Sequence, residues 1–275
     1  MVLKKNSIKL DSVLREINNF TGIIKKIIKT EKLYDDIIDI LQILSLSSHW
    51  VYYNLIFAEQ NISEWEENGK IIKSLKEEFR KSPDYTISKI EMDKSLIYIY
   101  SHFFIIIDTG SRISFPALKL KLSKKYIRNL YIYPYESLNN CIINNKNLLN
   151  FKINIIDKIY EIRNFRNNFT HYHTWFSYVI PSKNIDIQIS KLYRDNKGIN
   201  FWEEGGETIF TTRDFDSSIF EKYGTNYKNN ELIDLKQMLI NDFEIVKEFI
   251  NNITTSSINN FEQWFKKIKE YFNKS

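Results

Sequence analysis

The stretch SLIYIYSHFFIII, residues 95–107, is almost wholly apolar and decides how the rest of the chain must fold. It is too short to span a membrane, and it contains His102. A helix that is apolar on all sides is buried, because no face of it suits water. We therefore expect residues 86–107 to form a central helix, with other helices covering it.

The segments on both sides of this run carry apolar residues at helical spacing. We predict further helices over 10–29, 32–58, 62–82, 136–149 and 153–169, and two C-terminal helices over about 229–252 and 257–273. The Gly and Pro of DTGSRISFP (108–116) are expected to break the central helix. The alternation of Leu118, Leu120 and Leu122 with lysines is compatible with a short strand. The predicted fold class is mainly α.

Residues 175–213 follow a different pattern from the rest of the chain. They contain short β-prone runs, separated by Pro181, DNKG and GG. We predict a small β-rich insertion here, before the C-terminal helices. No internal repeat or Pro/Ser-rich linker is visible, so one domain over 1–275 that contains this insertion is the simplest organisation.

Composition narrows the class of protein further. With 7 Gly and 4 Pro, the chain has too few turn residues for an all-β fold. The single cysteine, Cys141, excludes an internal disulfide framework and a CxxC metal site. The first residues carry no apolar signal segment, and the apolar run over 40–58 is interrupted by polar residues. We expect a cytoplasmic protein without membrane association. We expect no metal and no cofactor, since the HYH at 171–173 lacks an obvious third ligand.

Positive charge is concentrated in one segment. The formal net charge is +5, yet between Asp108 and Glu136 there is no acidic residue. The bases in this interval are Arg112, Lys119, Lys121, Lys124, Lys125 and Arg128. The aromatic residues among and just after them are Phe115, Tyr126, Tyr131, Tyr133 and Tyr135. This pattern is compatible with RNA binding through phosphate contacts and base stacking, with Lys124, Lys125 and Arg128 as contacts. The alternative is a solvated basic loop whose tyrosines pack inward.

The second informative stretch is RNFRNNFTHYH, residues 163–173, which holds half of the four histidines. On a helix with about 100° per residue, Ile155, Ile159, Ile162 and Phe169 form an apolar stripe. Arg166 lies within that stripe. A guanidinium there is costly unless it meets a carboxylate such as Asp108, a carbonyl, an anion or a partner chain.

His171 follows Arg166 by five positions, which in an unbroken helix places it about 140° away. The two side chains converge if the helix ends near NNFT, or if a second subunit supplies one of them. Asn167 and Asn168 suit a helix C-terminus, because Asn tolerates the left-handed conformation. The alternative is a solvated helix end that compensates the helix dipole, which leaves the position of Arg166 unexplained.

The residues RNNFTH at 166–171 resemble the Arg-x4–6-His signature of HEPN domains, in which Asn often follows the Arg, as Asn167 does here. The resemblance implies a HEPN-like helical bundle that acts as a metal-independent endoribonuclease, usually as a homodimer with facing motifs. Many relatives are toxins or effectors of prokaryotic antiviral defence. It implies that His171 is the general base or acid, that Arg166 holds the phosphate and that Asn167 orients either one. Arg163, at the start of the stretch, is a further RNA-binding candidate.

The chain departs from one family pattern. Some relatives carry a Tyr two residues after the His, which a partner nucleotidyltransferase modifies to silence the toxin. Here that position is His173, so regulation by an antitoxin or other partner protein is left open. His173 also fits the Arg-x6-His spacing and is a second catalytic candidate. The alternatives are a non-catalytic helical module that binds nucleic acid or protein, and a sensor in which residues 175–213 recognise a ligand.

Overall fold

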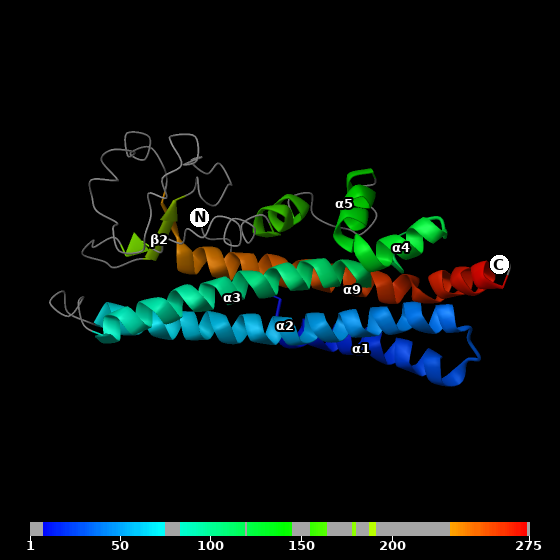
Figure 1. The fold of residues 1–275 in the computed structure, drawn as a ribbon, viewed down its shortest axis with the longest axis horizontal. Helices are drawn as coiled ribbons and strands as arrows, with labels where there is room; N and C mark the ends of the chain where they lie inside the picture. Colours follow the sequence, from blue (N-terminus) through cyan, green and yellow to red (C-terminus); the bar gives the residue numbers. More distant parts are fainter. Residues whose placement is uncertain are drawn as a thin grey trace. The chain divides into compact units, whose positions relative to one another are not determined.

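The computed structural model describes residues 8–74, 83–118, 120–144, 155–163, 178–179, 187–190 and 232–273. Within these ranges the fold is mainly α, as predicted, with seven helices (Figure 1). They are α1 (Leu10–Thr30), α2 (Asp35–Ser74), α3 (Pro83–Ile113), α4 (Lys124–Ile132), α5 (Pro134–Asn144), the helix over 155–163, and α9 (Leu235–Phe272). None of these described helices is long and apolar enough to cross a membrane.

The chain divides into two compact units, each built from separate stretches of sequence. The first comprises Met1–Glu59, Ser101–Tyr160 and Phe243–Ser275, and the second comprises Gln60–Tyr100 and Glu161–Asp242. The stretches of the two units alternate along the chain, so the division does not separate an N-terminal from a C-terminal part. The single domain over 1–275 stays a prediction.

The first unit has a core in which aromatic side chains join several helices. Phe20 of α1 meets Phe261 of α9 edge to face, with ring centroids 5.7 Å apart. Phe261 also lies 5.4 Å from Trp264, measured between ring centroids. On α1 the buried residues Val13, Ile17, Phe20 and Ile24 recur every three or four positions, which explains why this helix packs along one side. The aromatic contacts between α1 and α9 therefore link residues far apart in the sequence.

The second unit has its own small core. Its buried apolar side chains include Trp65 of α2, Leu96 and Ile99 of α3, and Leu239 of α9. Tyr100 donates a hydrogen bond of 2.7 Å to the buried carboxylate of Asp242. A buried charge is tolerated only with such partners, so this contact fixes the two helices against each other within the unit.

Three short strands are also described: β1 (Tyr178–Val179), β2 (Ile187–Ser190) and β3 (Leu232–Asp234). They form an antiparallel sheet in the order β1-β2-β3, with Val179 opposite Ile187 and Ile189 opposite Ile233. β3 occupies residues that we predicted to begin a helix. Most of the predicted β-rich insertion over 175–213 lies outside the described residues.

The predicted break of the central helix at residues 108–116 is wrong at its start, because α3 continues to Ile113. Gly110 lies inside this helix. A Cβ at that position would overlap the side chain of Ile250 and lie 3.6 Å from Ile253 and from Val51. Here the glycine allows α3 to pack closely against α9 and α2, and it does not end the helix.

Other predicted boundaries are also wrong. α2 runs without a break through residues 58–62, and α9 runs without a break through 252–257. In α9 the polar residue Ser257 is fully buried and donates a hydrogen bond of 2.5 Å to the carbonyl of Ile113, at the end of α3.

The short strand that the alternation of leucines and lysines suggested is not formed at residues 120–122. α5 begins at Pro134, which is favourable in the first turn of a helix.

Candidate nucleic-acid interface

The predicted catalytic residues Arg166, Asn167, His171 and His173 lie outside the described residues, so their arrangement stays a prediction. The helix that leads to them is described over 155–163. Its predicted apolar stripe is confirmed as far as it is described, because Ile155, Ile159 and Ile162 are buried. Arg163, the last described residue of this helix, is partly exposed.

The predicted RNA contacts Lys124, Lys125 and Arg128 all lie on α4 and are exposed. Ser123 caps this helix, since its hydroxyl accepts a 3.1 Å hydrogen bond from the backbone N–H of Tyr126. The buried residues of α4 are Tyr126 and Leu130, on the face that points inward. The amphipathic pattern of α4 therefore directs its three basic side chains to solvent.

Arg112 belongs to the basic segment in sequence but has a structural role. Its guanidinium donates hydrogen bonds of 3.1 Å to the backbone carbonyls of Leu130 and of Tyr131. These carbonyls lie in the last turn of α4, where a positive charge is favourable. Arg112 thus fixes the end of α4 to the last turn of α3.

The aromatic residues of the segment divide into two groups. Phe115, Tyr126 and Tyr135 are buried, so base stacking on them is excluded and the inward-packing alternative is right for these three. Tyr126 accepts a 2.6 Å hydrogen bond from the indole N–H of Trp264 and donates one of 3.2 Å to the carbonyl of Phe115. Burial raises the pKa of Tyr126, so the phenol stays neutral.

Tyr131 and Tyr133 are exposed by 40% and 46% and remain available for stacking. Burial raises the pKa of Tyr131, and the nearby carboxylates of Asp39 and Asp36 raise it further. Negative charge beside Tyr131 repels a phosphate backbone. Of the two exposed tyrosines, Tyr133 therefore suits contact with RNA better.

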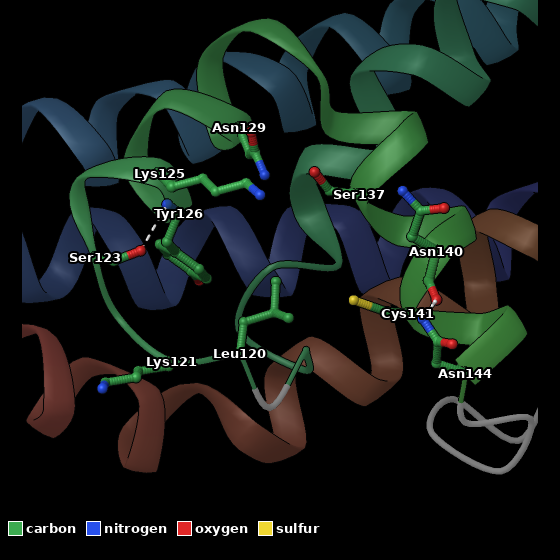
Figure 2. A pocket seen from close by; sticks show the side chains of 10 residues that line it. All are labelled: Leu120, Lys121, Ser123, Lys125, Tyr126, Asn129, Ser137, Asn140, Cys141 and Asn144. Carbon is green, nitrogen blue, oxygen red and sulfur yellow. Dashed lines mark hydrogen bonds between the residues drawn. The ribbon is translucent and has the colours of Figure 1, made fainter.

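A pocket of about 580 Å³ opens beside α4 and α5 (Figure 2). The segment before α4 and α4 itself line it with Leu120, Lys121, Ser123, Lys125, Tyr126 and Asn129. α5 lines it with Ser137, Asn140, Cys141 and Asn144. None of these lining residues is acidic. Lys125 therefore belongs both to the exposed basic face of α4 and to a pocket.

Sequence reasoning missed the α5 side of this pocket, although a signal was present. Ser137, Asn140, Cys141 and Asn144 follow one another at i, i+3, i+4 and i+7, which places them on one face of a helix. This face is polar but uncharged, whereas surface helix faces are usually charged.

Two of the four histidines have structural partners. The Nδ1 atom of His49 lies 2.7 Å from the carbonyl oxygen of Ser45, and its Nε2 atom lies 3.4 Å from the ammonium of Lys25. The Nδ1 atom of His102 lies 2.7 Å from the amide oxygen of Asn54. Both histidines thus have structural contacts within the helical core and at its edge. Among the described residues no cluster of three or more His, Cys, Asp or Glu could hold a metal ion.

Comparisons with protein-family models, with curated proteins and with solved structures found no match to this chain.

Proposed function

We propose that this chain is a metal-independent endoribonuclease of the HEPN type, active as a homodimer in the cytoplasm and serving as a toxin or effector in prokaryotic antiviral defence. The observation that carries the proposal is the spacing of Arg166, Asn167 and His171 after a helix on which Ile155, Ile159 and Ile162 form a buried stripe. An arginine that continues such a stripe needs an anionic or carbonyl partner. A phosphodiester is such a partner.

The proposed chemistry uses the ribose 2′-hydroxyl as an internal nucleophile. His171 takes the proton of this hydroxyl or gives one to the leaving 5′-oxygen, because imidazole titrates near neutrality. Arg166 holds the phosphate and stabilises the charge that develops on it, and Asn167 orients either side chain. The products end in a 2′,3′-cyclic phosphate and a 5′-hydroxyl. His173 is the alternative catalytic histidine.

The test is cleavage of RNA in EDTA by the wild type and by His171→Ala, His173→Ala and the double variant. We expect one single variant to lose about 10²–10⁴-fold in rate, as when one proton-transfer group is removed. His49→Gln is the matched control, since it removes a histidine of α2 that has structural partners. Full activity in the double variant would refute the proposed mechanism.

A second candidate function is a non-catalytic module that binds nucleic acid. The exposed bases Lys124, Lys125 and Arg128 on α4 favour it, because phosphate contacts need no catalytic group. RNA that binds tightly and remains intact in the presence of the wild-type protein would support this function. In either case Arg163 is a proposed further contact to RNA.

A further inference from the structure

The pocket beside α4 and α5 has two chemically different sides. The cationic side carries Lys125 of α4 and Lys121 of the preceding segment. The amide side carries Asn140 and Asn144 of α5. Figure 2 shows that Lys125 extends toward Ser137, and that the thiol of Cys141 points toward Leu120 between the two sides. A ligand that fits both sides has an anionic end and a neutral polar end.

The cationic side suits a phosphate group. Lys121 and Lys125 are exposed ammonium groups, and no acidic side chain among the lining residues competes for them. Lys125 also lies in the first turn of α4, where the backbone N–H groups carry partial positive charge. Charge-assisted contacts of this kind are about twice as strong as neutral hydrogen bonds.

The amide side suits the edge of a nucleobase. An Asn side chain offers two donors and an acceptor, which match the donor and acceptor groups of a base edge. Asn140 and Asn144 of α5 supply such groups to the pocket. Leu120 and the half-buried Cys141 add apolar surface for the face of a base. The pocket volume of about 580 Å³ lies within the usual range for sites that bind small molecules.

The wall of the pocket is held in place before any ligand binds. Tyr126 is fixed by its hydrogen bonds with Trp264 and Phe115, and Ser123 fixes the start of α4. On the other side the amide of Asn144 donates a 2.8 Å hydrogen bond to the carbonyl of Asn140. A pocket whose side chains need no rearrangement binds its ligand with a smaller loss of conformational entropy.

We propose that this pocket binds a nucleotide, with its phosphate at Lys125 and its base against Asn140 and Asn144. This site goes beyond the proposed ribonuclease activity and does not depend on it. The nucleotide is either a free mononucleotide or the terminal nucleotide of an RNA strand, since both present the same phosphate, sugar and base.

The rate at which Cys141 is alkylated reports on ligand binding, because Cys141 is the single cysteine of the chain and lines the pocket. Burial raises the pKa of its thiol, so alkylation is followed at a mildly alkaline pH. We expect AMP, GMP, CMP or UMP to slow the reaction of the full chain with N-ethylmaleimide. Protection by a nucleoside is expected to need at least about tenfold more ligand, because the charge-assisted contact is missing. Protection by ribose 5-phosphate that equals protection by the nucleotides would overturn the proposal, as would no protection by any nucleotide.

Two variants test the assignment of the two sides by calorimetric titration with the mononucleotide that protects best. Lys125→Gln is expected to weaken binding about tenfold. Asn140→Ala is expected to weaken nucleotide binding without changing the weaker binding of ribose 5-phosphate. Lys26→Gln on α1 is the matched control, since it removes an exposed lysine that does not line the pocket. Equal affinities in wild type and Lys125→Gln would reject the phosphate site.

The source of the nucleotide is decided by short RNA oligomers with a 5′-phosphate or a 5′-hydroxyl. Protection of Cys141 by mononucleotides assigns the pocket to a free ligand. Protection only by the 5′-phosphorylated oligomer assigns it to the end of an RNA strand. Equal protection by both oligomers, without protection by mononucleotides, would place an internal part of the strand there and contradict a terminal-phosphate site.

Discussion

His102 shows how a single side chain is held by the fold. Its Nδ1 atom donates to the amide oxygen of Asn54, because the amide nitrogen of Asn54 donates to the carbonyl of Trp50 at 2.7 Å. The ring also lies beside Phe57, with centroids 5.7 Å apart. Burial lowers the pKa of His102 from the usual 6.5, since a partly buried imidazolium loses hydration.

This lowered pKa predicts a pH dependence of stability. Above pH 6.5, the pKa expected in the unfolded chain, His102 is neutral in both states and has no effect. As the pH falls below that value, the unfolded chain takes up a proton that the folded chain resists, so the free energy of unfolding decreases. We expect His102→Asn, which keeps a donor toward Asn54, to lose less stability than the wild type between about pH 7.5 and about pH 5. Thermal melts at several pH values measure the difference, and identical pH profiles would contradict it.

At the level of residues, the sequence predicted that Lys124, Lys125 and Arg128 are exposed. It did not predict that Arg112 would bind the carbonyls of Leu130 and Tyr131, because this contact depends on where α3 and α4 end. The amides of α5 were missed for a similar reason: an Asn becomes part of a pocket only when another element lies opposite it.

At the level of elements, substitution of Gly110 tests how closely α3 and α9 are packed. Gly110→Ala gains about 1 kcal/mol of helix propensity but forces a methyl group against Ile250. Overpacking of a core costs about 1–3 kcal/mol, so we expect a net loss of stability. In an Ile250→Val background the overlapping methyl group is absent, and Gly110→Ala is expected to be neutral or stabilising. Chemical denaturation of the four proteins gives the coupling energy, and a coupling near zero would refute the close approach.

The same elements show why helix boundaries could not be read from the sequence. Glycine is a common helix breaker, yet Gly110 is used for close packing within α3. The polar run NNITTSS looks like a loop, yet Thr254 and Ser257 are fully buried within α9. Local propensity is weak, and tertiary contacts override it, as the hydrogen bond from Ser257 to the carbonyl of Ile113 shows.

At the scale of the whole molecule, we expect the affinity for RNA to depend more on where the positive charges lie than on the net charge. A triple variant with Gln at Lys124, Lys125 and Arg128 lowers the formal net charge from +5 to +2. If these side chains contact phosphates, the slope of log K for single-stranded RNA against log[salt] becomes shallower by about 2. Affinity measured at several salt concentrations gives this slope.

The control has the same net charge but a different distribution. Gln at Lys26, Lys29 and Lys267, which are exposed on α1 and α9, also lowers the net charge by three. We expect these changes to leave the slope nearly unaffected. If the two triple variants changed the slope equally, RNA binding would depend only on the net charge of the protein. The assignment of α4 as the binding face would then be wrong.

The mainly helical class could be predicted from composition and apolar periodicity, because both depend directly on local structure. The division into two units with alternating segments could not be predicted. It depends on contacts such as Phe20–Phe261 and Lys269–Glu31, between residues that are distant in sequence. No short-range pattern records such pairs.

The role of α9 has a consequence for how the protein forms during translation. Residues of α9 complete the core around Phe20, Gly110, Ile113 and Tyr126, and they are made last among these partners. The apolar faces of α1, of the start of α2 and of the end of α3 are therefore without their final cover until the ribosome has added α9. A nascent chain in this state is a substrate for chaperones, and slow translation of the α9 codons prolongs its exposure to aggregation.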